Sequence, residues 1–325
     1  MIVPQFWAEG RAQDRRGGKQ ITVHRFGWSD ASQEDAQRQA DARARAALDR
    51  LVAGERLARR EPKVPYNGAE GVPIREEILS RHGEVVITRN TYGARCLNTP
   101  NVLFVDIDFA DRPSFLLSLA VFGALNLLAA LAAWWSGSRW VLAGLWLLSL
   151  VLVSGVSAMV YRALGRLTGG PERRARRRIE QFLVAHHDWH VRVYRTPAGL
   201  RVLALHRTFD PSEAEVEACF RALGADPAYV RMCRNQRCFR ARVSPKPWRI
   251  GMEGHLRPRP GVWPVRPELL GLRQSWVARY EELARGFAAC RFVAALGGHG
   301  VDPSAEQVQR LHDEMCQAHG DLALA

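Results

Sequence analysis

The sequence predicts an α+β protein whose soluble fold is interrupted by a transmembrane helical hairpin. Two long apolar runs without charged residues follow one another near the middle of the chain. Short strand-like runs and helical patterns alternate on both sides of them. A chain of 325 residues has room for a sizeable soluble core beside such a membrane part.

The chain is basic, with a formal net charge of +13 from 46 Lys and Arg against 33 Asp and Glu. This excess suits an anionic partner such as phosphate, nucleic acid or the cytoplasmic leaflet, although arginine used as a solvated surface residue would give the same count. The six cysteines are spread thinly, unlike a secreted disulfide framework, so we expect reduced thiols in a cytoplasmic setting. The N-terminus shows no cleavable signal pattern.

Residues 1–100 are expected to form an N-terminal α+β cytoplasmic region. Two strand-like runs, Gln5–Gln13 and Lys19–Phe26, flank a short turn with two glycines and predict a β-hairpin. Alanines recur on one face of residues 33–52, which predicts a helix. The other face of that helix is rich in Arg, Asp and Gln and shows no chemistry.

A loop rich in Pro and Gly is expected at 61–71, followed by a short helix at Pro73–Arg81 and a strand at Glu84–Arg89. The stretch NTYGARCLNTPN then reads as a polar turn. Polar groups crowded at strand ends are common in binding sites, but a satisfied surface turn has the same composition. The candidate polar cluster consists of Arg89, Asn90, Tyr92, Arg95 and Asn98.

A transmembrane helical hairpin at residues 114–161 is the strongest feature of the sequence. Neither Ser114–Trp135 nor Trp140–Tyr161 contains a charged residue, and each is long enough to cross ~30 Å of hydrocarbon. Only SGSR separates the two runs, and tryptophans stand near this turn, where interfacial aromatic residues belong. A buried helical pair in a soluble core is the alternative.

The flanking charges predict that both termini are cytoplasmic and that the protein lies in a bacterial inner (cytoplasmic) membrane. Arginines crowd behind the second run, at Arg162, Arg166 and 173–178, whereas the connecting turn carries Arg139 alone. We expect the 173–178 run to contact anionic lipid headgroups, at about 1 kcal/mol for each charge near the surface. The hairpin contains no charge that would suggest transport, so it should act as a tether.

Elements on both sides of the hairpin combine into one expected sheet. The strand Asn101–Phe109 precedes the hairpin, and after it come a helix, strands at His190–Arg195 and Leu200–His206, another helix, and a strand at Cys238–Val243. The order strand, helix, strand, strand, helix, strand is that of a ferredoxin-like fold. The sequence therefore predicts a split ferredoxin-like domain made of residues 101–110 and 171–245.

The rest of the chain is expected to be a proline-rich arm at 246–266 and a C-terminal helical region at 267–325. Helices are predicted at Pro267–Ala295 and from Asp302 to about His319, because a proline follows a start signal in each case.

Asp106 and Asp108 are the candidate metal-binding residues. They stand two positions apart at the end of a strand and therefore point to the same face. Two such carboxylates can hold a divalent cation through oxygen ligands, which leaves other positions for water and substrate phosphates. We therefore expect Mg²⁺ or Mn²⁺ here. The alternative is that both aspartates end the strand, cap the next segment and pair with arginines.

The pattern VDIDF, with apolar and Asp residues alternating on a first strand, resembles the palm domain of nucleotide-polymerising enzymes, in particular the archaeo-eukaryotic primase superfamily. That family continues with a glycine-containing turn and a His; the matching stretch here is TPAGLR, in which Arg201 stands in place of His. The resemblance implies a site for metal and for nucleotide or nucleic-acid phosphate. The phosphate contacts that it implies are Arg195, Arg201, Arg240, Arg242 and Lys246.

The stretches TRNTYGARCLNTP and FRARVSPKPWR also resemble a family of uncharacterised bacterial two-span membrane proteins, which implies no activity. The alternative function is a non-enzymatic, membrane-tethered scaffold or regulator that binds an acidic partner through basic surfaces. A sequence-independent nucleic-acid tether is a third hypothesis. No zinc is expected, because Cys233 and Cys238 lack the second half of a zinc motif, and His206 and His255 stand at unsuitable spacing.

Overall fold

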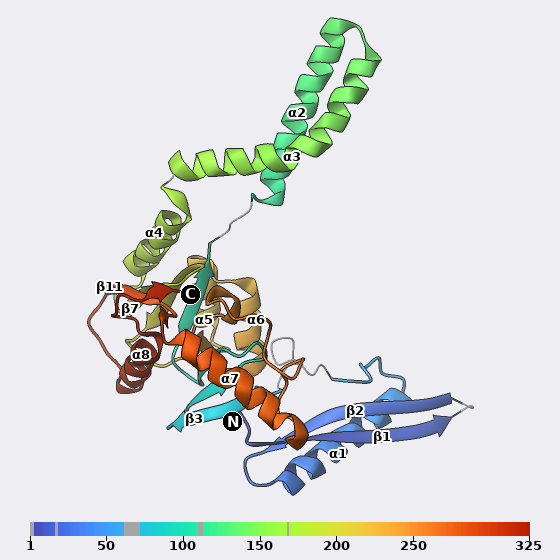
Figure 1. The fold of residues 1–325 in the computed structure, drawn as a ribbon, viewed down its shortest axis with the longest axis vertical. Helices are drawn as coiled ribbons and strands as arrows, with labels where there is room; N and C mark the ends of the chain where they lie inside the picture. Colours follow the sequence, from blue (N-terminus) through green and yellow to red (C-terminus); the bar gives the residue numbers. More distant parts are fainter. Residues whose placement is uncertain (1–2, 17–18, 62–71, 110–112, 168) are drawn as a thin grey trace. The chain divides into compact units, whose positions relative to one another are not determined.

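The computed structural model describes residues 3–16, 19–61, 72–109, 113–167 and 169–325. The chain divides into two compact units. The first consists of Met1–Ile107 and Phe182–Ala325, and the second is Asp108–Gln181. The first unit contains several small sheets and the second contains two long apolar helices (Figure 1). The mixed α+β class is therefore confirmed.

The N-terminal hairpin and helix form as the sequence predicts. β1 (Phe6–Arg16) pairs antiparallel with β2 (Lys19–Ser29), and α1 (Gln33–Val52) packs across both strands. Gly10 and Gly27 permit this close packing, because a Cβ atom at either position would overlap the backbone of the helix. The residues that the helix buries are alanines: Ala36, Ala40, Ala44 and Ala47.

A four-stranded antiparallel sheet follows in the order β3-β4-β5-β9. Its strands are β3 (Glu77–His82), β4 (Val85–Arg89), β5 (Arg95–Thr99) and β9 (Phe239–Arg242). The predicted helix at 73–81 is wrong, because its second half is β3. Pairing with β4 gives this segment its backbone hydrogen bonds, and such tertiary context overrides weak helix propensity. β5 likewise lies within the stretch that was expected to be a turn.

A second four-stranded sheet has the order β11-β7-β8-β6. Its strands are β6 (Phe104–Asp108), β7 (His190–Arg195), β8 (Gly199–Ala204) and β11 (Arg291–Gly297). Three of these strands were expected in one sheet. The fourth expected member, the strand within 238–243, is not part of it: β9 pairs with β5, and β11 takes the edge beside β7.

The C-terminal region is only partly helical. α7 (Leu270–Ala284) confirms the first half of the predicted helix, but β10 (Phe287–Ala288) and β11 replace its second half. A short apolar run such as FVAAL fits a helix or a strand, and here pairing with β7 decides the outcome. β10 pairs parallel with β12 (Ala323–Leu324). α8 (Pro303–Cys316) forms where the sequence predicts it.

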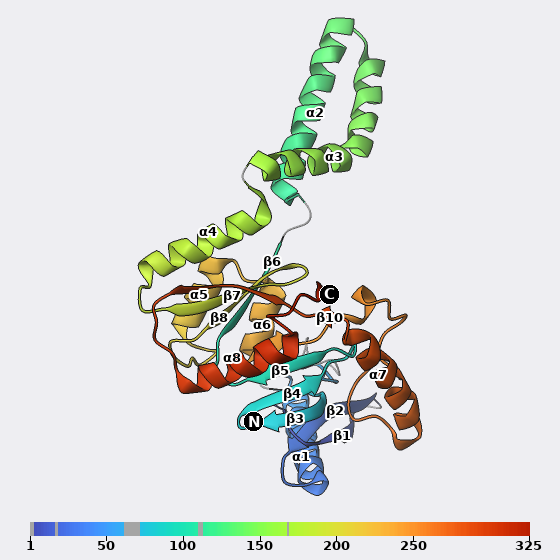
Figure 2. The ribbon, with the colours of Figure 1, turned by 60° about the vertical axis from the view of Figure 1, so that its left-hand side comes forward.

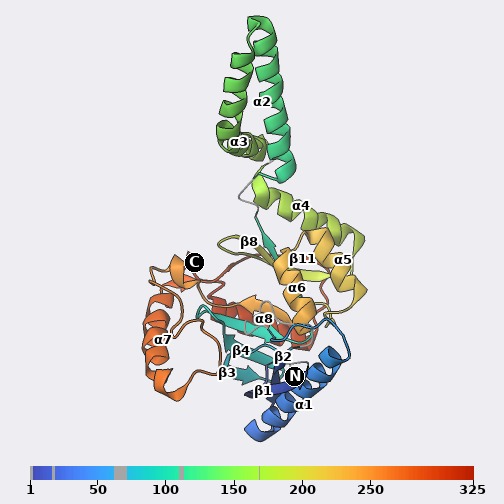
Figure 3. The same ribbon diagram turned by 90° about the vertical axis from the view of Figure 1, so that its right-hand side faces the viewer.

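Helices pack against both sheets within the first unit. α8 lies between the two four-stranded sheets (Figures 2 and 3). α5 (Ala214–Leu223) and α6 (Pro227–Gln236) cover the sheet that contains β6. Tyr229 of α6 fixes this packing, because its hydroxyl donates to the carbonyl oxygen of Phe104 on β6 over 3.0 Å.

The second unit is built on α2 (Phe115–Ser136) and α3 (Arg139–Leu167), which lie side by side. Both helices are long and apolar enough to cross a membrane, and only 11% of the apolar window of each is buried. Their large apolar side chains face outward, as Trp135 does with 92% of its surface exposed. α4 (Gly170–Ala185) follows and carries the arginine-rich segment.

Candidate functional site

Asp106 is held by an arginine from the neighbouring strand. Nε of Arg201, on β8, lies 2.7 Å from Oδ1 of Asp106, and Nη2 lies 3.2 Å from Oδ2. The Arg201 side chain is 3% exposed, whereas that of Asp106 is 28% exposed. Such a two-pronged contact is the strongest arrangement of arginine with a carboxylate. The carboxylate therefore neutralises a buried cation.

The remaining nitrogen of Arg201 points toward α8 and β9. Nη1 donates to the carbonyl oxygen of Arg242 over 2.9 Å and lies 3.3 Å from Nε2 of His312. Burial would lower the pKa of Arg201, but the charge and hydrogen bonds of Asp106 raise it above its ordinary value. Arg201 stands where the palm resemblance expects a His, and it is a permanently charged part of the core.

Asp108 is the exposed last residue of β6. Neither Asp106 nor Asp108 belongs to a group of three or more potential metal ligands among the residues that the structure describes. A cation at Asp106 would have to share the carboxylate with Arg201. The expected metal site at these two residues remains a prediction.

The other expected phosphate contacts are dispersed. Arg240 is buried and binds Glu76, with Nη2 at 2.8 and 2.6 Å from the two carboxylate oxygens. Nη1 of Arg242 donates to the carbonyl oxygen of Ser244 over 2.9 Å. Arg195 ends β7 and is half-buried, and the ammonium of Lys246 lies 5.4 Å from the ring centroid of Trp248.

The expected polar cluster shapes a turn between β4 and β5. The side-chain oxygen of Asn90 accepts from the backbone N–H groups of Tyr92, Gly93 and Ala94. Arg89 donates to the carbonyl oxygen of Gly93 over 2.8 Å and to Glu281 over 2.7 Å.

The other members of the cluster also have internal partners. The amide of Asn98 donates to the carbonyl oxygen of Val86 and to the hydroxyl of Thr88. Nε of Arg95 lies 3.9 Å from Glu281, and the ring of Tyr92 packs edge-on against Trp248. Nε of Arg89, Nε of Arg95 and Oδ1 of Asn98 are nevertheless buried without a hydrogen-bond partner among the described residues, so the binding role of this cluster stays a prediction.

A cluster that the sequence did not suggest lies beside Arg201. One potential ligand atom from each of Cys290, His312 and Cys316 lies within 4.8 Å of the others, and all three residues are fully buried. His312 and Cys316 stand four apart on α8 and share a face. That spacing was a readable signal, but nothing in the sequence links Cys290 to them.

Within the cluster, Cys290 differs electrostatically from Cys316, because burial raises the pKa of the Cys316 thiol well above its ordinary value. A hydrogen bond with Cys316, followed by the proximity of His312 and Arg201, lowers the pKa of Cys290 well below its ordinary value despite burial. Burial instead raises the pKa of Cys233 well above its ordinary value. Burial also raises the pKa of Cys238, so Cys233 and Cys238 behave as core residues.

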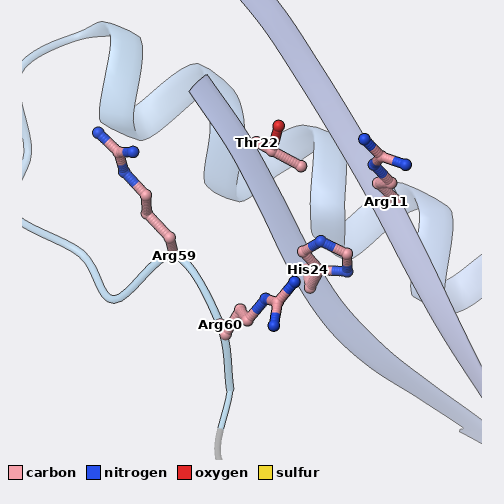
Figure 4. A pocket seen from close by; sticks show the side chains of 5 residues that line it. All are labelled: Arg11, Thr22, His24, Arg59 and Arg60. Atoms are coloured by element: carbon pink, nitrogen blue, oxygen red, sulfur yellow. The ribbon is translucent and has the colours of Figure 1, made fainter. Parts of the chain in front are cut away.

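A basic pocket of about 410 Å³ lies on the N-terminal hairpin (Figure 4). It is lined by Arg11, Thr22, His24, Arg59 and Arg60. Nδ1 of His24 lies 3.0 Å from Glu9, which fixes the ring at the pocket wall. Guanidinium and hydroxyl groups on one concave surface suit an anion.

A second basic pocket lies in the unit that contains the apolar helices. Its volume is about 340 Å³, and it is formed by the end of α3 and the start of α4. Its lining combines arginines with an aromatic side chain: Tyr161, Arg162, Gly165, Arg166, Gly170, Pro171 and Arg174. We call it the α3–α4 pocket.

Comparison of the chain with protein-family models, with curated proteins and with solved structures gave no match.

Proposed function

We propose that this protein is an integral membrane tether that binds anionic lipid headgroups in the α3–α4 pocket and so holds its α+β unit at the cytoplasmic face. The observation that carries this proposal is a pocket lined by three arginines at the C-terminal end of the second apolar helix. This proposal develops the hypothesis of a non-enzymatic, membrane-tethered scaffold. It names a lipid headgroup as the ligand of one basic surface.

The exposed apolar surface of α2 and α3 supports membrane insertion. In water, an unbroken run of exposed Leu, Val and Trp side chains would be an aggregation surface. In a bilayer the same side chains face hydrocarbon, and all helix backbone groups are satisfied within the helix. The amide of Asn126 lies 3.3 Å from the hydroxyl of Ser149 on the partner helix, so this polar residue is paired within the hairpin.

The chemistry of the pocket supports a headgroup phosphate as its ligand. Arg162 and Arg166 are one helical turn apart near the end of α3, and Arg174 lies on α4. Guanidinium groups match phosphate oxygens in pairs, and Tyr161 supplies the amphipathic ring that favours the headgroup level. Each charge near an anionic leaflet adds about 1 kcal/mol.

The test compares two triple variants in vesicles. Full-length protein is reconstituted in phosphatidylcholine with or without phosphatidylglycerol, and lipids retained after detergent extraction are identified by native mass spectrometry. We expect the wild type to retain phosphatidylglycerol, and the variant Arg162→Gln, Arg166→Gln, Arg174→Gln to lose it. The matched control removes three charges on α4 that do not line the pocket: Arg173→Gln, Arg177→Gln and Arg178→Gln.

If both triple variants lost phosphatidylglycerol equally, the lipid would be held by general charge attraction, and a specific pocket would be contradicted. Competition by inorganic phosphate without any effect of the lipid would assign the pocket to a soluble anion. Alkaline extraction of membranes tests the insertion itself, since a peripheral protein would be released.

A second function, a divergent palm-like domain that binds metal and nucleotide phosphate, is favoured by one observation. The strands β6, β8 and β7 lie in that order, with β8 inserted between the other two, as in a split βαβ unit of a ferredoxin-like fold. In this proposal Asp106 and Asp108 hold Mg²⁺ or Mn²⁺ at the end of β6.

The informative variant for the palm proposal is Asp108→Asn. Replacing Asp106 would leave buried Arg201 without its carboxylate and would confuse unfolding with loss of metal. Calorimetric titration of Mn²⁺ with a nucleoside triphosphate into the wild type should show metal-dependent binding that Asp108→Asn abolishes. Asp188→Asn, at another exposed aspartate, should bind like the wild type. A wild type without binding would contradict this second function.

A further inference from the structure

The cluster of Cys290, His312 and Cys316 is held by the backbone as well as by packing. Cys290 follows β10 and precedes β11. The N–H of Ala289 donates to the carbonyl oxygen of Cys316 over 3.0 Å, and that of Phe292 to Ala318 over 2.9 Å. These bonds fasten the segment of Cys290 to the end of α8, so the three side chains converge in a fixed place.

We propose that Cys290, His312 and Cys316 bind a Zn²⁺ ion that fastens the β10–β11 segment to α8. Two thiolates and one imidazole are the ligand types that zinc prefers, at Zn–S distances of about 2.3 Å and Zn–N distances of about 2.0 Å. Sulfurs around a tetrahedral zinc ion lie about 3.8 Å apart, so ligand atoms already within 4.8 Å of one another need only small side-chain adjustments.

His312 is oriented as a metal ligand. Nδ1 lies 3.1 Å from a carboxylate oxygen of Asp313, and Nε2 lies 3.8 Å from the sulfur of Cys290. Nε2 also lies 3.3 Å from Nη1 of Arg201, and zinc bound at Nε2 would replace that contact. Metal-binding histidines commonly donate their other ring N–H to a carboxylate in this way. Asp313 is itself fixed by Gln309 at 2.8 Å and by Arg192 at 3.1 Å.

The charges around the cluster balance when zinc is present. Two thiolates neutralise Zn²⁺, while Asp106 neutralises Arg201 and Arg192 neutralises Asp313. The guanidinium of Arg201, with Nη1 3.3 Å from Nε2 of His312, places a positive charge beside the cluster. A buried thiolate without such partners would be strongly disfavoured.

The site is structural in character. All three ligands are fully buried, so no open position faces solvent for a substrate. Within the described part of the chain, no further Cys, His, Asp or Glu joins the group. The carbonyl oxygen of Arg242, 4.0 Å from the sulfur of Cys316, or an enclosed water would complete four-coordination.

The expectation of no zinc was argued from Cys233, Cys238, His206 and His255. His312, which could be taken for a surface residue in the sequence, is fully buried. Cys233 and Cys238 stand close in the sequence, yet neither belongs to the group described here. Three ligands from two separate segments form the proposed site instead.

The test measures metal in the full-length protein purified in detergent from zinc-containing medium. We expect one zinc per chain, with an X-ray absorption signature of two sulfurs and one nitrogen from protein. Cobalt(II) exchanged into the site should give thiolate charge-transfer absorption. These readouts use the wild type and do not depend on whether a variant folds.

Variants then assign the ligands. Cys290→Ser and Cys316→Ser should each lose the cobalt charge-transfer band, whereas Cys233→Ser, which replaces a buried cysteine outside the cluster, should keep it. Asp313→Asn should weaken zinc affinity about 10–100-fold while keeping the same ligand signature. The proposal is overturned if the wild type contains no stoichiometric zinc, if mass spectrometry shows a Cys290–Cys316 disulfide instead, or if Cys290→Ser binds cobalt unchanged.

Discussion

Arg240 and Arg201 are two of the buried arginines that bind carboxylates in the first unit, and their surroundings differ. Arg240 and Glu76 are both nearly inaccessible, at 8% and 5% side-chain exposure, and their network continues through Thr88 to Asn98 inside one sheet. Arg201 is equally buried, but its partner Asp106 reaches partial exposure at 28%, and its third nitrogen faces His312.

The difference separates a structural pair from a pair beside a candidate site. In the Arg240–Glu76 pair, which we call the closed pair, both side chains are buried and the carboxylate also accepts from Thr88. The Arg201–Asp106 pair links β8 to β6 and also contacts β9 and α8. We call it the open pair, because Asp106 is partly exposed. Arginines that looked alike in the sequence, as candidate phosphate contacts, are therefore distinguished by the surroundings of their carboxylates.

Removing the carboxylate of the closed pair should have the largest effect. Glu76→Ala leaves Arg240 charged, buried and unpaired, which costs about 3–5 kcal/mol of unfolding free energy. Urea unfolding of the full-length protein in detergent, followed by tryptophan fluorescence, measures the shift. The exposed Glu314→Ala should change stability by less than about 0.5 kcal/mol. Equal stability of the two variants would mean that the pair is not closed to water.

The sequence predicted the parts of the fold that depend on local patterns. The alanine face of α1, the hairpin of β7 and β8, and the two apolar helices each follow from spacing within one segment. The partners of β9 and β11 did not, because pairing is set by segments far along the chain.

The candidate sites show the same limit. The aspartates of VDIDF were visible in the sequence, but the partner of Asp106 is Arg201, 95 residues away. Cys290 joins His312 across 22 residues that include a strand and most of a helix, so no motif could connect them. Spacing reveals ligands that share one helix, as His312 and Cys316 do, and leaves the others hidden.

Removing the carboxylate of the open pair should have a smaller effect. Asp106→Asn keeps a hydrogen-bond acceptor and admits water at a partly exposed position, so Arg201 loses charge compensation but not every partner. A cost of about 1–3 kcal/mol is expected in the same unfolding experiment. A cost above that of Glu76→Ala would reverse the comparison between the two pairs.

The smallest effect is expected at Thr88, which connects the closed pair to Asn98. The hydroxyl of Thr88 donates to Glu76 over 2.6 Å and accepts from the amide of Asn98 over 3.0 Å. Thr88→Val removes both bonds at nearly constant volume and should cost about 1 kcal/mol. The same change made in a Glu76→Gln background completes a double-mutant cycle, which isolates the coupling between the two side chains.

A coupling of at least about 0.5 kcal/mol would show that Thr88 supports the charge on Glu76 and through it Arg240. Additive effects would mean that the hydroxyl satisfies only Asn98. The carboxylate of Asp106 instead meets the guanidinium of Arg201 at the edge of the cysteine and histidine cluster. Coupling at Glu76 would therefore establish that the hydroxyl of Thr88 stabilises the carboxylate of the closed pair.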